Sequence, residues 1–188
     1  MSKSLWIKCG VAAIAAGVVV ALVMRRGPHP LQTGDRLPAF TLQQVDAVGP
    51  LSIRGQGHEV VLVNFWATWC PPCVEEAPSL EKFAREMAPR GVRVIGVSVD
   101  RNGADLLKFV AQHHLTYPIL RDPDQSLAAR FGTYKFPETY IFDRDGRLAD
   151  KIIGPTDWSD PRMIQFVGAL THWNTAAPQQ AAAATGAY

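Results

Sequence analysis

The chain has 188 residues, 47% of them hydrophobic, with a formal net charge of +2. This length is enough for one ordinary domain with a sizeable core. The largest basic cluster is the pair Arg25 and Arg26, so we expect no nucleic-acid partner, because neutralising a phosphate backbone requires a basic stripe. Three cysteines, Cys9, Cys70 and Cys73, are too few for a fold that depends on several disulfides.

An apolar stretch near the N-terminus predicts a membrane anchor. Residues 5–24 are apolar except for Lys8, and a helix of that length measures roughly 30 Å, the thickness of a bilayer core. A cleaved signal peptide is the alternative, but the run is long and no small-x-small cleavage site precedes Arg25 and Arg26. We therefore expect residues 1–26 to form an uncleaved anchor. The charges on its two sides nearly balance and leave its orientation open.

Two further segments lack the pattern of a globular fold. Residues 27–37 contain prolines and glycines without periodicity, which is typical of a spacer. Residues 174–188 are rich in alanine without an apolar stripe, and we expect a disordered tail there. The folded domain is expected to span residues 38–173.

Strands and helices are expected to alternate within this domain. In chain order we expect strands at 40–45 and 51–53, a buried strand at 60–66, a helix at about 72–87, a buried strand at 92–100, helices at 104–114 and 125–131, a hairpin of 138–143 with 148–154, and a helix at 161–173. This order predicts an α/β sandwich with a mixed β-sheet flanked by helices. Trp158 and Trp173 are interpreted as packing for the last helix.

The sequence NFWATWCPPCVEE (64–76) places Cys70 and Cys73 at the start of a predicted helix. A helix N-terminus stabilises an anion, so a cysteine there ionises more easily. With Cys70 as the N-cap, Pro71 and Pro72 occupy the first two helical positions, and only the Cys73 N–H remains to bond the Cys70 sulfur. Cys70 should therefore ionise less readily than in a motif with fewer prolines, which favours a reducing pair over a strongly oxidising one.

Helical phase separates two neighbouring acids, Glu75 and Glu76. The apolar stripe of the helix consists of Glu76, Leu80, Phe83 and Met87. Glu76 is thus expected to point toward the core, one turn after Cys73. A carboxyl shielded from water has a raised pKa and can exchange a proton near neutrality, as a group that activates the second cysteine must. The alternative makes Glu76 only an acid of the first helical turn, stabilised by the helix dipole.

A CxxC pair can also bind zinc or copper, or take part in peroxide reduction. A structural zinc site needs four ligands, and only His113 and His114 could join the two thiolates. Copper delivery would normally require a wider cysteine spacing and a converging histidine. Peroxide reduction would need a further cysteine in the domain. A CxxC-based zinc or copper module is the alternative to a redox centre, and we predict no metal site.

Three motifs resemble the thioredoxin superfamily. They are W-C-x-x-C at 69–73, Pro78 five residues after the second cysteine, and FPETYIFD at 136–143. The resemblance covers roughly residues 35–173 and is closest to the membrane-anchored TlpA, ResA and DsbE/CcmG group of thiol-disulfide oxidoreductases.

The resemblance implies a thioredoxin-like fold with an N-terminal strand extension and a central insertion that contains a helix, between Asp100 and Asp122. It implies that Pro137 is cis, although only about 5–6% of X-Pro bonds adopt this form. It also implies that Phe136 pairs with the substrate chain beside the dithiol. Asn64 replaces the buried Asp of typical thioredoxins, as in the anchored group.

The resemblance further implies an enzyme outside the cytoplasm that reduces disulfides in partner proteins, such as apocytochrome c or copper-site cysteines. Cys70 would attack, Cys73 would resolve the mixed disulfide, and Glu76 would assist proton transfer. Trp69, exposed beside the dithiol, would contact the substrate. The chain contains no flavin or nicotinamide motif, so we expect no cofactor and a membrane dithiol carrier as electron donor.

Overall fold

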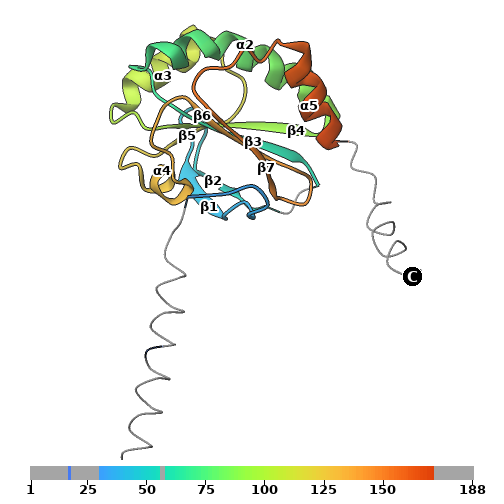
Figure 1. Ribbon diagram of the computed structural model, residues 1–188. Coiled ribbons are helices and arrows are strands. Elements are labelled where there is room, and N and C mark those ends of the chain that lie inside the picture. Colours follow the sequence, from blue (N-terminus) through green and yellow to red (C-terminus); the bar gives the residue numbers. More distant parts are fainter. Residues whose placement is uncertain (1–16, 18–29, 56–57, 172–188) are drawn as a thin grey trace, which may run out of the picture.

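The computed structural model describes residue 17, residues 30–55 and residues 58–171 (Figure 1). The predicted anchor (1–26), apart from Gly17, and the predicted tail (174–188) lie outside the described residues, as do residues 27–29 of the predicted linker and Trp173. The rest of the predicted linker, residues 30–37, packs on the domain instead of forming a spacer, because Leu31 and Leu37 join the hydrophobic core and the Leu31 N–H donates to the Phe131 carbonyl oxygen. Within the described part of the chain, no helix has the length and apolar character needed to cross a membrane.

A five-stranded mixed sheet forms the centre of the domain, with strand order β5-β4-β3-β6-β7. The strands are β3 (Val60–Trp66), β4 (Val92–Ser98), β5 (Ile119–Arg121), β6 (Glu138–Phe142) and β7 (Leu148–Ile153). β3, β4 and β5 run parallel, whereas β6 is antiparallel to both β3 and β7. The mixed sheet predicted from the sequence is thus confirmed.

The central strands β3 and β4 are buried on both faces, as their continuous apolar runs predict. Asn64 is the polar exception in β3 and is 2% exposed. Burying an amide without partners is costly. Its position in the middle of the central strand therefore marks a polar site inside the core.

Strand β5 was not predicted, because its three residues give no periodic signal and follow a proline. It joins the sheet beside β4, and Gln44 forms an isolated bridge with Leu120. The predicted N-terminal extension is present as a separate two-stranded sheet of β1 (Phe40–Gln43) and β2 (Pro50–Ile53). The hairpin of β6 and β7 turns at Gly146, whose φ of 71° suits glycine.

Helices cover both faces of the sheet. In the view of Figure 1, α2 (Pro71–Met87), α3 (Gly103–Gln112) and α5 (Pro161–Thr171) lie on one side, and α4 (Ser126–Phe131) lies on the other side with β1 and β2. A single 3₁₀ turn, η1 (Ala88–Arg90), follows α2. The four helices within residues 30–171 were all predicted, and the ends of α2, α3 and α4 differ from the prediction by no more than two residues.

The core packs tightly around the central strand. On one face Phe65 contacts Phe131 at 5.1 Å between ring centroids, and Tyr140 contacts both rings. On the other face Leu80, Phe83 and Met87 of α2 are 1–2% exposed. Each such side chain stabilises the fold by roughly 1.5–3 kcal/mol. α2 is thereby held firmly on the sheet, with its first turn at the end of β3.

Candidate active site

Cys70 and Cys73 form a disulfide at the start of α2, with Cα atoms 5.3 Å apart. Cys70 is the N-cap of the helix, as predicted, and Pro71 and Pro72 occupy its first positions. The Cys70 side chain accepts no capping hydrogen bond; the N–H groups of Cys73 and Val74 donate instead to the Cys70 carbonyl oxygen. The Cys70 sulfur is bonded to Cys73 in this oxidised state, so the reducing character expected of the pair stays a prediction.

A buried carboxylate holds the loop that leads into the dithiol. The backbone N–H and the hydroxyl of Thr68 donate to Asp100 at 2.9 and 2.7 Å, and the Ser98 hydroxyl donates to Asp100 at 2.7 Å. Hydrogen bonds to a charged group contribute about 1.5–3 kcal/mol each. This role of Asp100 was not predicted, because it depends on β4 lying beside β3.

Glu76 lies one turn after Cys73 and is 5% exposed, which confirms that it points into the core. Its Oε1 accepts hydrogen bonds from Asn64 Nδ2 at 3.2 Å and Trp158 Nε1 at 2.9 Å. Its Oε2 accepts a hydrogen bond from the Thr156 backbone N–H at 3.0 Å. Glu75, the neighbouring residue, is exposed. The helical phase thus separated the two acids correctly.

Burial raises the pKa of Glu76 to about 7, from an ordinary value of 4.5. The hydrogen bonds from Trp158, Thr156 and Asn64 favour the charged form and lower the pKa, but the loss of water around the carboxylate outweighs them. Glu76 can therefore both accept and release a proton near neutral pH.

Cys73 and Glu76 line the same small cavity, of about 10 Å³, together with Asn64, Trp66, Ala77, Leu80, Tyr117 and Pro137. A cavity of this size lies at the lower limit for one water molecule. Burial holds the pKa of Tyr117 well above its usual range, so its phenol stays protonated. Glu76 is therefore the proton acceptor available to Cys73 within this cavity at neutral pH.

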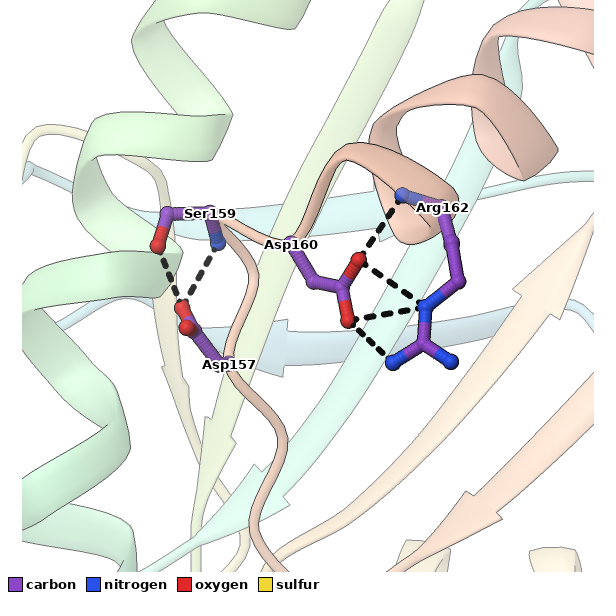
Figure 2. A network of polar contacts seen from close by, with 4 residues as sticks. All are labelled: Asp157, Ser159, Asp160 and Arg162. Carbon is purple, nitrogen blue, oxygen red and sulfur yellow. Dashed lines mark hydrogen bonds and ion pairs between the residues drawn. The ribbon is translucent and has the colours of Figure 1, made fainter.

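The loop between β7 and α5 supplies two partners of Glu76 that sequence reasoning missed, Thr156 and Trp158. Trp158 was assigned to packing, and it does pack, fully buried, against Phe83 at 5.3 Å. Its indole nitrogen nevertheless donates to Glu76. Figure 2 shows two contacts in the following stretch of chain: Asp157 accepts from Ser159, and Asp160 accepts from Arg162.

The surface beside the dithiol is aromatic. Trp69 is 62% exposed, and its ring contacts the ring of Phe136 edge-on, with centroids 6.2 Å apart. The Phe136–Pro137 peptide bond is cis, as the resemblance implied, and Pro137 lines the cavity of Cys73 and Glu76. The structure thus brings together all six predicted residues: Trp69, Cys70, Cys73, Glu76, Phe136 and Pro137.

No group of three or more His, Cys, Asp or Glu side chains suitable for a metal ion occurs among residues 30–55 and 58–171. His113, one candidate ligand, stacks on Phe109 with ring centroids 4.0 Å apart.

Comparison with known proteins identifies the family of this chain. Residues 33–151 match the AhpC/TSA family. The chain belongs to this family. It is 34% identical over 167 residues to the thiol:disulfide interchange protein DsbE of Pseudomonas fluorescens biotype C, an alignment that covers 83% of this chain and 92% of that protein. The thiol-disulfide oxidoreductase ResA of Bacillus anthracis is 29% identical over 126 residues, covering 66% and 71%.

The fold agrees with this membership of the AhpC/TSA family. A crystal structure of a thiol:disulfide interchange protein of the thioredoxin family from Chlorobium tepidum TLS superposes with a TM-score of 0.63 at 26% identity, covering 73% of this chain and 98% of that one. The domain is therefore thioredoxin-like, as predicted. Like its AhpC/TSA relatives of the ResA and DsbE type, the chain is a thiol-disulfide oxidoreductase.

Proposed function

We propose that this enzyme reduces disulfides in partner proteins outside the cytoplasm. The observation that carries the proposal is the position of Glu76, a buried carboxyl with a pKa of about 7 that shares one cavity with Cys73. A disulfide that served only to stabilise the fold would need no proton acceptor beside its second cysteine. A dithiol that turns over does need one, because its resolving thiol must ionise in each cycle.

The reaction has two thiol-disulfide exchanges. The Cys70 thiolate attacks one sulfur of the partner disulfide, forms a mixed disulfide and releases one partner thiolate. Glu76 then accepts the proton of the Cys73 thiol, and the Cys73 thiolate attacks the Cys70 sulfur. This forms the Cys70–Cys73 disulfide and releases the second partner thiolate. Two electrons pass to the partner, and the oxidised form is the one described here.

Trp69, Phe136 and Pro137 form the substrate-docking face in this proposal. The exposed Trp69, in ring contact with the half-buried Phe136, offers a partner chain apolar contact beside the dithiol. The backbone at Phe136 would pair with the extended substrate chain.

We propose that residues 1–26 anchor the enzyme, that residues 27–29 join the anchor to the domain, and that residues 174–188 form a tail. The substrates would be apocytochrome c or copper-site cysteine pairs, and a membrane dithiol carrier would supply electrons. The family relationship to proteins of the DsbE and ResA type supports a protein disulfide as substrate.

A trapping experiment tests this function. A Cys73→Ser variant in the native cell should accumulate mixed disulfides with its partners through Cys70, and mass spectrometry identifies them. Cys70→Ser is the matched control: it should trap nothing and lose disulfide reductase activity. If Cys70→Ser retains that activity, the nucleophile is assigned wrongly.

The anchor has its own test. The full-length protein should stay in the membrane fraction after a carbonate wash, and N-terminal sequencing should find residues 1–24 retained. A mature chain that begins after Met24 would contradict the anchor without affecting the proposed reaction.

A further inference from the structure

Two hollows meet at Glu76. One is the small cavity of about 10 Å³ beside Cys73. The other is a groove of about 260 Å³, open to solvent, lined by Glu75, Glu76, Ser79, Pro155, Thr156 and Asp157. Glu76 is the one residue that lines both hollows. The Glu76 side chain thus connects the cavity of the resolving cysteine with a groove that is open to bulk water.

The hydrogen bonds of Glu76 follow this division. Oε1 accepts from Asn64, which lines the cavity, and Oε2 accepts from the backbone of Thr156, which lines the groove. Each carboxylate oxygen is therefore bonded to a wall of a different hollow. A proton taken up by the oxygen on the cavity side can leave on the groove side after the carboxyl group flips, which exchanges its two oxygens.

The substrate-docking face lies elsewhere. Trp69 and Phe136 are absent from the lining of the groove, which is formed by the first turns of α2 and the loop after β7. A partner held by Cys70 in a mixed disulfide would cover the aromatic face while the groove stayed open. The bound partner would then block proton exchange with solvent through the docking face at the step in which Cys73 must lose its proton.

We propose that the groove at Pro155–Asp157 is the route by which the proton of Cys73 reaches solvent, with Glu76 passing it from the cavity to the groove. The Cys73 thiol loses its proton to the Glu76 carboxylate, directly or through one water molecule. The resulting carboxyl group gives the proton to water or buffer in the groove. The charge on Glu76 is restored, and the proton leaves as hydronium or protonated buffer. The proposal rests on the proposed function above.

Two further features support the route. Trp66 lines the cavity, and its indole nitrogen has no hydrogen-bond partner among the residues that the structure describes, so it can donate to a water molecule there. At the outer end, Ser159 holds the Asp157 side chain in place through two hydrogen bonds (Figure 2). Acidic side chains at the mouth of a groove raise the local concentration of cations, including protonated buffer.

A series of substitutions at Glu75 tests the route. Glu75 is exposed and lines the groove. Changing it to Ala, Leu and Trp removes the same charge each time but fills the groove by increasing amounts. The reduced full chain is mixed with a synthetic peptide disulfide, quenched in acid and alkylated, so that attack by Cys70 and resolution by Cys73 are timed separately.

We expect the attack rate to stay at the native value in all variants, which also verifies that they fold. The resolution rate should fall in the order Ala, Leu, Trp, by about tenfold or more for Glu75→Trp, since a positioned acid–base group contributes ~10²–10⁴-fold. Glu86→Trp, on the same exposed face of α2 but outside the groove, is the matched control and should resolve at the native rate.

Equal resolution rates for the three Glu75 variants would overturn the route. So would an equal loss in Glu86→Trp. Glu76→Gln, measured in parallel, distinguishes failure of the groove from failure of the proposed role of Glu76. If Glu76→Gln resolves at the native rate, the role of Glu76 in the proposed function fails. If Glu76→Gln is slow and the Glu75 series is flat, the groove fails and the proposed function stands.

Discussion

Replacing Glu76 with Gln should remove a pH-dependent part of the stability of this protein. The pKa of Glu76 is about 7 in the folded chain, against 4.5 as its ordinary value. The folded state therefore binds more protons than the unfolded state between these two pH values, and the free energy of unfolding falls as the pH rises through this window. A difference of about 2.5 pKa units corresponds to about 3 kcal/mol.

The contribution of Glu76 to the free energy of unfolding depends on pH. Below pH 4.5 Glu76 is protonated in both states, and its contribution is fully present; above about pH 7 it has been lost. Gln cannot ionise, so the unfolding free energy of the Glu76→Gln variant lacks this dependence on pH. Its carbonyl oxygen can still accept from Asn64 and Trp158, but its amide faces the Thr156 N–H, another donor. That mismatch costs about 1–3 kcal/mol at every pH.

The assay is denaturant unfolding of the oxidised protein at intervals from about pH 4 to about pH 8. The Cys70–Cys73 disulfide keeps both thiols from titrating. The difference in unfolding free energy between native protein and Glu76→Gln should change by about 3 kcal/mol across the window. Glu86→Gln, which removes an exposed acid from the same helix, should run parallel to the native protein. Parallel curves for native protein and Glu76→Gln would refute the raised pKa.

Three other substitutions follow from the same contacts. Trp158→Phe removes a hydrogen bond that lowers the pKa of Glu76. The pH profile of mixed-disulfide resolution should therefore move to higher pH, and an unchanged profile would contradict the role of Trp158. Asp100→Asn weakens the hydrogen bonds that hold the loop before the dithiol, and we expect denaturant unfolding to show a loss of about 1.5–3 kcal/mol, which an unaltered midpoint would exclude. Lys151→Met leaves Glu138, 0% exposed, without its ion-pair partner. The expected loss of about 3–5 kcal/mol should be partly recovered when Glu138→Gln is added, and no recovery would count against the pairing.

Local pattern was enough to predict much of this molecule. The run at 60–66 gave the limits of β3, because a strand buried on both faces needs an unbroken apolar sequence. The 3.6-residue period of α2 placed Glu76 inside and Glu75 outside, because successive helical residues are separated by about 100°. The position of Cys70 as the N-cap followed from the two prolines after it. Each of these inferences depends only on neighbours along the chain.

The three-residue strand β5 could not be inferred from neighbours along the chain. Its run is too short to show a period, and it becomes a strand because β4 offers a free edge beside it. Local pattern also does not predict the cis form of the Phe136–Pro137 bond. Propensity alone favoured trans, and it was the resemblance to a family that indicated cis.

The sequence by itself determined that a carboxyl would be buried one turn after the dithiol. The tertiary structure decided what that carboxyl can do. Its partners Thr156 and Trp158 are 80 and 82 residues away along the chain, and the groove that reaches it is closed on one side by their loop. The pKa of Glu76 is a balance between lost solvation and these donors. That balance depends on distances between segments that only the folded packing brings together, because no local pattern encodes them.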